Sequence, residues 1–583
     1  MAMKRDAAAE ASSSELAGAL SASRGVFWHA GGFSLFVNLL MLAGPLYMLQ
    51  VYDRVLASQS IPTLVALTVL ILVLYGTLGV LEWARSGLFS VAASNFEGLL
   101  GPRAAAAAMA QSLADPGRAS DRPIRDLRQL RRFIASPVAG AVFDAPFSPL
   151  FLVVLFMLHP LFGLWAVLGA VILVATSALN ERASARLTKE SEDLERASAL
   201  RAAEMTRNAE VLKALGMGEA ARRRWQNVFD GGDTAFARSG RILSGFSSGT
   251  KAFRLFLQSA ILGIGAWLVI KGEATPGAMI AASILMGRAI APLEQIVGQW
   301  RTIAGARENW ASLKTALAGA PAPAAQMPLP PIRGALRVEN AVAGPPGSNA
   351  PVLKGLTFSL DPGDVLGVLG PSAAGKSSLA RVLTGAWPVM SGHVRIDGAD
   401  LSTLPSETLG PQIGYLPQQA DLLSGTVRDN IARFRENAAP EAIIAAAQSA
   451  GCHDMILRLA KGYDTEIGLG GAYLSAGQRQ RIGLARALFG NPNLIILDEP
   501  NSNLDGPGEQ ALQSAIGAAK ARGATVILIA HRPNAILHCT KLMVIDEGRI
   551  REFGPADEVL AKVMPKPGAA NIRTLRPGDG GHV

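Results

Sequence analysis

Lys376 and Ser377 close a glycine-rich loop whose residue types suit a phosphate chain. Residues 370–377 read Gly-Pro-Ser-Ala-Ala-Gly-Lys-Ser and match the spacing G-x-x-x-x-G-K-[ST]. The apolar run Val365–Leu369 precedes the loop, and a helix-forming stretch follows from Ser378. Glycines let backbone N–H groups approach a polyphosphate, and a helix N-terminus favours its negative charge. The spacing therefore predicts Lys376 at the β- and γ-phosphates and the Ser377 hydroxyl on Mg²⁺, with a chance glycine-serine turn as the alternative.

Two carboxylates end a later apolar strand, Leu494–Leu497. Asp498 is placed to hold Mg²⁺, directly or through water, as in other phosphate-loop enzymes. Glu499 lies one residue further on and can act as the base that faces the attacking water. The pair therefore predicts a hydrolytic site beside the glycine-rich loop.

Three further segments of the chain carry residues that can contact a nucleotide or its metal. Gln418 comes after the apolar run Ile413–Pro417, and its amide can bridge Mg²⁺ or water to a neighbouring domain. Ser475, Gly477 and Gln478 open a helix, where a hydroxyl and a backbone N–H can donate to a γ-phosphate. His531 ends the buried run Thr525–Ala530 and can sense the γ-phosphate, although a single histidine is more often structural.

The chain as a whole has the composition of a membrane protein, and its apolar stretches lie in the first half. In all 583 residues, 49% are hydrophobic and 17% are charged, against about 25% charged in soluble domains. Mean hydropathy is +0.27. Six apolar stretches are each near the roughly 20 residues that a spanning helix needs; buried helices of a soluble core would explain only one or two of them. The stretches are Val26–Tyr52, Thr63–Trp83, Ala141–Leu158, Leu161–Leu179, Phe253–Ile270 and Pro276–Trp300.

The loop charges predict an orientation. Residues 85–140 carry eight Lys and Arg, and residues 181–250 carry twelve. The connections on the other side of the membrane, near 53–62, 159–160 and 271–275, carry only Arg54 and Lys271. Positively charged loops stay in the cytoplasm, so both termini are expected there. The net charge of +9 then needs no nucleic acid to explain it. We expect spans two to five to continue into the cytosol as helices, with short elements near Pro123–Phe133 and Ala203–Met217; solvated surface helices are the alternative.

Single charges within the spans leave two interpretations open. Arg288 falls midway through the sixth span, where it either lines a wet cavity or pairs with a carboxylate inside the protein. Asp144 is expected at the membrane interface. Cys452 and Cys539 form neither a disulfide framework nor a metal motif, so we expect them to be reduced and structural.

The motifs of residues 335–565 resemble those of the ATP-binding-cassette superfamily. The resemblance implies an α/β phosphate-loop ATPase domain and ATP hydrolysis with Mg²⁺ at two sites between two cassettes. Because this chain has one cassette and six spans, it also implies a homodimer with twelve spans. Each site would use Gln418, Asp498, Glu499 and His531 of one chain, Ser475, Gly477 and Gln478 of the other, and the loop residues Gly370, Pro371, Ser372, Ala373, Ala374, Gly375, Lys376, Ser377 and Ser378.

Two positions depart from that family pattern. Ala476 stands where the family usually has glycine, while Gly477 is kept. Many relatives stack adenine on an aromatic residue before the second strand, but Val338–Leu356 contains none. The alternative apolar surface in this stretch is Pro345-Pro346.

Segments 44–56, 142–147 and 287–295 resemble marks of bacterial type I secretion transporters, in the subgroup that exports proteases, lipases and haem-carrier proteins. The resemblance implies an inner-membrane location, a periplasmic membrane-fusion adaptor, an outer-membrane tunnel protein, and unfolded cargo with a C-terminal signal. An exporter of lipids or hydrophobic small molecules fits the cassette equally well. A membrane-tethered signalling ATPase is disfavoured, because a tether needs a single span.

The expected organisation therefore has five parts. Residues 1–25 form a flexible cytosolic N-terminus, and 26–317 form an all-α domain of six transmembrane helices with cytoplasmic extensions. Five prolines make 318–334 a semi-rigid linker. Residues 335–565 form the nucleotide-binding domain, and 566–583 form a flexible tail.

Overall fold

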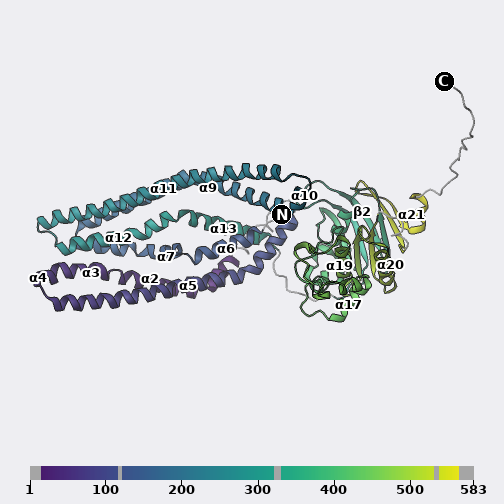
Figure 1. The fold of residues 1–583 in the computed structure, drawn as a ribbon, viewed down its shortest axis with the longest axis horizontal. Coiled ribbons are helices and arrows are strands. Elements are labelled where there is room, and N and C mark those ends of the chain that lie inside the picture. Colours follow the sequence, from purple (N-terminus) through teal and green to yellow (C-terminus); the bar gives the residue numbers. More distant parts are fainter. Residues whose placement is uncertain (1–14, 116–120, 321–329, 531–537, 564–583) are drawn as a thin grey trace, which may run out of the picture. The chain divides into compact units, whose positions relative to one another are not determined.

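The computed structural model describes residues 15–115, 121–320, 330–530 and 538–563, and Figure 1 shows its ribbon. The described residues form two compact units. One is made largely of helices that precede residue 321, and the other is a mixed α/β unit from residue 330 onward. The expected tail 566–583 and most of the linker fall outside the described residues.

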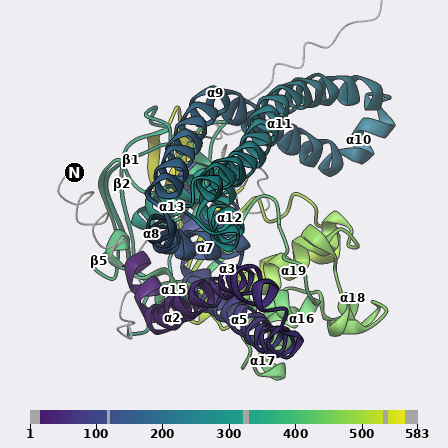
Figure 2. The same ribbon diagram turned by 90° about the vertical axis from the view of Figure 1, so that its left-hand side faces the viewer.

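All six predicted spans are confirmed as helices long and apolar enough to cross a membrane. They are Arg24–Ser58, Ile61–Ala114, Pro137–Leu158, Pro160–Arg207, Gly218–Ile270 and Pro276–Ile296. Three of them are far longer than a bilayer requires: α5 (Ile61–Ala114), α9 (Pro160–Arg207) and α11 (Gly218–Ile270) have 54, 48 and 53 residues. At 1.5 Å per residue each reaches about 70–80 Å, against roughly 30 Å of hydrocarbon. Spans two, four and five thus continue as helices, and α9 and α11 lie side by side in Figure 1 and Figure 2.

The third span does not continue in this way. A separate helix, α6 (Arg122–Ile134), ends before the turn Ala135–Ser136, and α7 (Pro137–Asp144) begins anew with proline in its first turn. Proline lacks the N–H that would extend the preceding helix, so the chain turns here. After a 3₁₀ turn at Ala145–Phe147, α8 (Ser148–Leu158) completes the span and joins α9 through His159 in a tight helical hairpin. The short element expected at the other tip is α10 (Ala209–Ala214).

The first span is interrupted rather than continuous. It consists of α2 (Arg24–Leu40), α3 (Ala43–Gln50), a π-helical turn (Val51–Val55) and α4 (Leu56–Ser58). Pro45 has no N–H for a helical bond, which accounts for the break before α3. In the π turn, the Asp53 carboxylate accepts hydrogen bonds from Thr275 Oγ1 at 2.6 Å and from the Gly277 N–H at 2.8 Å. Asp53 thus caps α12 (Pro276–Gly298), which α13 (Trp300–Gly319) follows.

Two further expectations need correction. Residues 15–22 are helical instead of flexible, because Leu16 is fully buried against an apolar cluster with Phe96 and Glu15 pairs with Arg103 at 2.6 Å. Asp144 is not simply an interfacial charge. Its Oδ1 lies 2.6 Å from an Arg85 nitrogen and accepts from Asn38 Nδ2 at 3.0 Å. Three helices, α2, α5 and α7, are therefore joined by one polar network.

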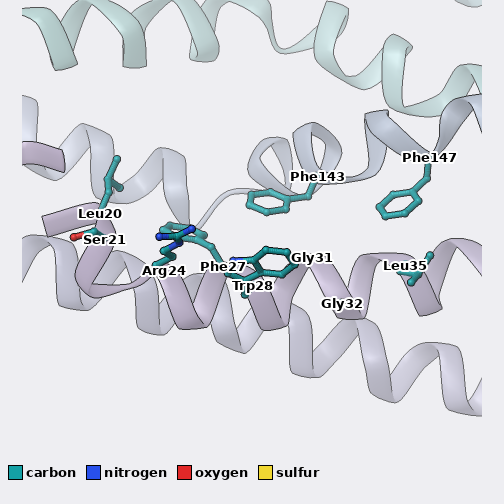
Figure 3. A pocket seen from close by; sticks show the side chains of 10 residues that line it. All are labelled: Leu20, Ser21, Arg24, Phe27, Trp28, Gly31, Gly32, Leu35, Phe143 and Phe147. Atoms are coloured by element: carbon teal, nitrogen blue, oxygen red, sulfur yellow. The ribbon is translucent and has the colours of Figure 1, made fainter. Parts of the chain in front are cut away.

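Beside this network lies an apolar groove of about 690 Å³ (Figure 3). Phe27 and Trp28 of α2 line it together with Phe143 and Phe147 from the third span. The Phe27 and Phe143 rings stack with centroids 6.1 Å apart. The stacked Phe27 and Phe143 rings and the polar network therefore both connect the first span with the third.

The α/β unit contains two sheets. The smaller is antiparallel with the order β2-β1-β4-β5, and the larger has the order β10-β9-β3-β8-β7-β6, in which all pairs except β10 with β9 are parallel. The strands β7 and β8 are buried along their whole length, as a parallel sheet covered by helices requires. The strands are β1 (Leu336–Ala343), β2 (Leu353–Leu360), β3 (Val365–Leu369), β4 (Ser391–Ile396), β5 (Ala399–Asp400), β6 (Ile413–Leu416), β7 (Leu494–Asp498), β8 (Thr525–Ile529), β9 (Lys541–Asp546) and β10 (Arg549–Pro555).

Helices complete this unit. The ones that carry or support the site are α14 (Lys376–Leu383), which follows β3, and α19 (Ala476–Leu488), which precedes β7. The others are α15 (Ser406–Leu409), α16 (Val427–Ile431), α17 (Pro440–Ser449), α18 (His453–Leu457), α20 (Gly506–Ala521) and α21 (Ala556–Val563). Cys452 is buried and Cys539 half-buried, and both are free thiols, as expected.

Candidate active site

The carboxyl ends of parallel strands bring the glycine-rich loop, the Asp498–Glu499 pair and Gln418 to one edge of the larger sheet. In the order β3, β8, β7, β6, these strands lead into the glycine-rich loop, position 531, the Asp498–Glu499 pair and Gln418. Ligands in open α/β sheets bind at this edge. His531 lies outside the described residues, so its predicted role stays a prediction.

The glycines of the loop are required by its backbone path. Gly370 has φ of 150°, and a Cβ there would lie 2.1 Å from the Ile545 carbonyl oxygen. Gly375 caps α14 with φ of 102°, and its Cβ would lie 2.9 Å from Leu353 Cδ2. A side chain at either position would push the loop away from β9 or β2. The chain therefore keeps bare backbone where a phosphate would approach the start of α14.

Lys376 lies inside the loop that precedes it. Its side chain is 5% exposed, and Nζ donates to the carbonyl oxygens of Gly370 at 2.8 Å and Pro371 at 2.7 Å. Burial lowers the pKa of Lys376, while the charges of Glu499 and Asp498 act in the opposite direction. The ammonium is thus held beside the strand-end carboxylates, ready for an anionic ligand.

Asp498 has the features of a cation ligand. It is 2% exposed, and within the described part of the chain its Oδ1 is buried without a hydrogen-bond partner. Burial raises the pKa of Asp498, and a hydrogen bond with the Ser377 side chain lowers it. A buried carboxylate oxygen beside a hydroxyl suits a hard cation such as Mg²⁺. The residues present therefore fit the predicted metal ligands Ser377 and Asp498.

Gln418 and Glu499 meet across the ends of β6 and β7. Gln418 Nε2 donates to Glu499 Oε2 at 3.1 Å. The Glu499 backbone is left-handed, with φ of 48°, and its N–H donates to the Ile529 carbonyl at 3.0 Å. The backbone turn fixes the position from which the Glu499 side chain extends, and the hydrogen bond from Gln418 fixes the orientation of its carboxylate. The arrangement suits a general base whose carboxylate must be oriented.

The predicted signature residues are occupied with each other. Ser475 Oγ accepts from the Gln478 N–H at 3.3 Å, and Gln478 Oε1 accepts from the Ser475 N–H at 2.8 Å, which is a capping box at the start of α19. A Cβ on Gly477 would lie 2.9 Å from the Asn503 carbonyl oxygen. Among the described residues, no hydrogen bond or ion pair joins this segment to the glycine-rich loop.

Sequence reasoning missed two groups near the site. Val352 lies against the loop, with its Cγ1 at 3.4 Å from the Cβ that Gly375 would carry. Tyr415 of β6 is half-buried; burial raises its pKa, as does the charge of Asp498, whereas Arg381 acts in the opposite direction. Neither residue belongs to a motif, so only the strand order reveals them.

Comparison with known families gives matches in both units. The sequence model of the ABC transporter family matches residues 353–502, and that of the ABC transporter transmembrane region matches residues 27–293. Among solved structures, that of a bacterial Atm1-family ABC exporter with ATP bound superposes with a TM-score of 0.81. It covers 92% of this chain and 96% of that one, at 24% identity. This last likeness concerns the fold.

Similar curated proteins carry names from secretion systems. The type I secretion system ATP-binding protein PrsD of Rhizobium meliloti is 43% identical over 94% of this chain and 94% of its own length. The cyclolysin secretion/processing ATP-binding protein CyaB of Bordetella pertussis is 30% identical, over 91% of this chain and 75% of its own. The alpha-hemolysin translocation ATP-binding protein HlyB of Escherichia coli is 29% identical over the same shares.

Proposed function

This chain belongs to the ABC transporter family and, within it, to the ATP-binding proteins of type I secretion, and from this we propose that it hydrolyses ATP to export unfolded proteins across the bacterial inner membrane. The identity with PrsD, which extends over 94% of both chains, carries the proposal. It includes the membrane half, where a cargo pathway must lie, as well as the ATPase half.

ATP supplies the phosphoanhydride bond, and Mg²⁺ would neutralise the charge that develops on its phosphates. Gly370–Ser378 would hold the phosphates, with Lys376 turning from its own loop carbonyls to the β- and γ-oxygens. Ser377 and Asp498 would hold the metal, with Gln418 beside them. Glu499 would take a proton from the attacking water, with its carboxylate oriented by Gln418. His531 would contact the γ-phosphate.

A homodimer completes each site in this proposal. The sequence has one glycine-rich loop, and the described residues contain six helices long and apolar enough to span a membrane. Its segment Ser475–Gln478 lies at a helix N-terminus, where a γ-phosphate of a second chain would find a hydroxyl and backbone N–H groups. We propose that two chains bind two ATP between them, which closes the cassettes and moves the long helices. Repulsion between the products then favours their separation.

The proposed location is the inner membrane, with both termini and the ATPase unit in the cytoplasm. The basic segments 85–140 and 181–250 support this orientation. The partners would be a periplasmic membrane-fusion adaptor and an outer-membrane tunnel protein, and the cargo would carry a C-terminal signal. Nucleic acid has no place in the proposal.

Secretion by living cells tests this function. Cells whose chromosomal copy carries Glu499→Gln should lose one or a few proteins from the medium, and those proteins should reappear in the cytoplasm. Glu441→Gln, at an exposed carboxylate on α17, is the matched control and should secrete normally. An unchanged set of secreted proteins, together with altered lipid in the outer leaflet, would instead support export of lipids.

A further inference from the structure

A polar cavity of about 430 Å³ lies inside the helical unit. Residues of α2, α5, α7 and α12 line it, and four of them are charged: Glu82, Arg85, Asp144 and Arg288. The cavity therefore has more charged lining residues than the groove of Figure 3, in which Arg24 is the charged residue among the described lining residues.

The cavity reaches well into the span. Arg288 follows Pro276, the first residue of α12, by twelve residues, which places it about 18 Å along the helix. This is roughly half of the 30 Å hydrocarbon thickness. Glu82 follows Ile61, the first residue of α5, by 21 residues and so lies about 31 Å along its helix, near the other boundary. Counted from helix starts placed at one membrane boundary, the cavity extends from near the opposite boundary to about mid-depth.

Two carboxylates near Arg288 already have partners. Asp144, in the same cavity, is taken by Arg85 at 2.6 Å. Glu294, on the same helix, is taken by Arg254 at 3.0 Å. Among the described residues, Arg288 has an exposed side chain, forms no ion pair, and makes one polar contact, with Met41 Sδ at 3.9 Å. Glu82 lines the same cavity, but it is not within 4.0 Å of Arg288.

A guanidinium at mid-membrane depth is costly unless it faces water or an anion. The cavity supplies room for water, and its permanent carboxylates do not neutralise Arg288. We propose that Arg288 binds carboxylate groups of the polypeptide as it enters the membrane. This inference rests on the proposed export of proteins. A planar guanidinium can hold a carboxylate through two parallel hydrogen bonds, whether that group is the chain's C-terminus or an Asp or Glu side chain.

Labelling of a cysteine introduced at position 291 tests the anion preference. Ala291 lines the cavity one helical turn from Arg288 and is exposed. In the full-length protein, with each rate divided by that reagent's rate with a free thiol in solution, Ala291→Cys should react about tenfold faster with the anionic reagent MTSES than with the cationic reagent MTSET, because a nearby cation concentrates anions. Adding Arg288→Gln should remove that preference, and adding Arg288→Lys should keep part of it.

Two controls define the background of this labelling. Leu285→Cys, on the same helix but 1% exposed in the packed core, should react with neither reagent. The unaltered protein should also be unreactive, because burial raises the pKa of Cys452 and of Cys539 to about 12.

Protection by short synthetic peptides identifies the source of the carboxylate. Three peptides of Gly, Ser, Ala and Leu would be compared: one with a free C-terminus, one amidated with internal Glu, and one amidated without Glu. If the first alone protects the Ala291→Cys variant from MTSES, the site is assigned to C-termini, and if the second alone protects it, the site is assigned to side chains. Protection by both assigns it to carboxylates in general. In each case Arg288→Gln should abolish the protection.

The contrary results are equally specific. Equal rates for the two reagents, or equal protection by all three peptides, would overturn the inference while leaving ATP-driven export intact. If Glu82→Gln reproduced every effect of Arg288→Gln, Arg288 would instead serve as an internal partner of Glu82. If the protein without any substitution exported no cargo when ATP is supplied, that result would contradict the proposed function, whatever the labelling shows.

Discussion

The side-chain amide of Gln418 donates a hydrogen bond to the carboxylate of Glu499, with 3.1 Å between Nε2 and Oε2. The two residues are 81 positions apart in the chain, and they meet because β6 and β7 are parallel neighbours that end at the same sheet edge. In the proposed mechanism, this contact would let Gln418 orient the carboxylate of the base.

Gln418→Ala should lower ATP turnover by about tenfold or more, because a general base contributes on the order of 100-fold or more only while it is correctly placed. The KM for ATP should change little, since the phosphate loop is untouched. Steady-state ATPase assays on the purified protein measure both constants. Gln448→Ala, at an exposed glutamine on α17, is the matched control. A raised KM with unchanged turnover would contradict an orienting role.

Asp498→Asn should separate stability from activity. Burial raises the pKa of Asp498 in the folded protein, so the ionised form costs stability once the pH exceeds the unfolded value near 4. At pH 7 without Mg²⁺, the variant should melt at the same temperature as the parent or a few degrees higher, while Mg²⁺-dependent ATP hydrolysis falls by at least about 100-fold. Melting curves with a chelator present, and ATPase assays with Mg²⁺, measure the two effects. A clear loss of stability in the chelator would contradict this, because it would show that contacts of the ionised carboxylate, such as that with Ser377, outweigh the cost of its burial.

Asp144→Asn should destabilise the helical unit, because it leaves the partly buried Arg85 without its carboxylate partner. Removing one partner of a fully buried ion pair costs about 3 kcal/mol or more, so the loss here should be at most about that size. The double variant Arg85→Gln, Asp144→Asn should recover part of that loss, since neither charge is then unpaired. Thermal unfolding in detergent of the parent, both single variants and the double variant gives the coupling energy. Strict additivity would mean that the pair contributes nothing.

The two cysteines should be inert in the native protein. Burial raises the pKa of Cys452 and of Cys539 to about 12, so the reactive thiolate becomes populated only as the pH approaches that value. At pH 8, a thiol reagent should modify them only after a denaturant is added. Rapid modification of either one in folded protein would show that its site opens.

Local patterns were sufficient to predict the parts that repeat a simple rule. The spacing between Gly370 and Ser377 identified the loop, and the apolar run before Asp498 identified a buried strand. The family resemblance implied that Gln418 and Glu499 share one site, and the structure places them in contact because the parallel strands β6 and β7 end at a common edge. The six spans followed from hydropathy alone, as each is long enough to register by itself.

Contacts between distant segments could not be predicted in this way. Nothing near Asp144 in the sequence indicates its pairing with Arg85, 59 residues away. Asp53, in the π turn, lies just past the end of an apolar run, and the contact that explains the turn is with Gly277, 224 residues later. Residues 15–22 were wrongly expected to be flexible, because polar and small residues outnumber the few apolar ones, among them Leu16, that dock onto α5. In each case the decisive partner belongs to another helix.

Reconstituted vesicles test the coupling of ATP to export most directly. Purified protein would be placed in liposomes with its ATPase unit outside, and the transfer of a cargo with a C-terminal signal into a protected compartment would be measured together with phosphate release. We expect both rates to fall together, by about 100-fold or more, in Glu499→Gln, with nucleotide binding retained. Continued transfer by that variant, or ATP hydrolysis by the parent without any movement of cargo, would contradict the account.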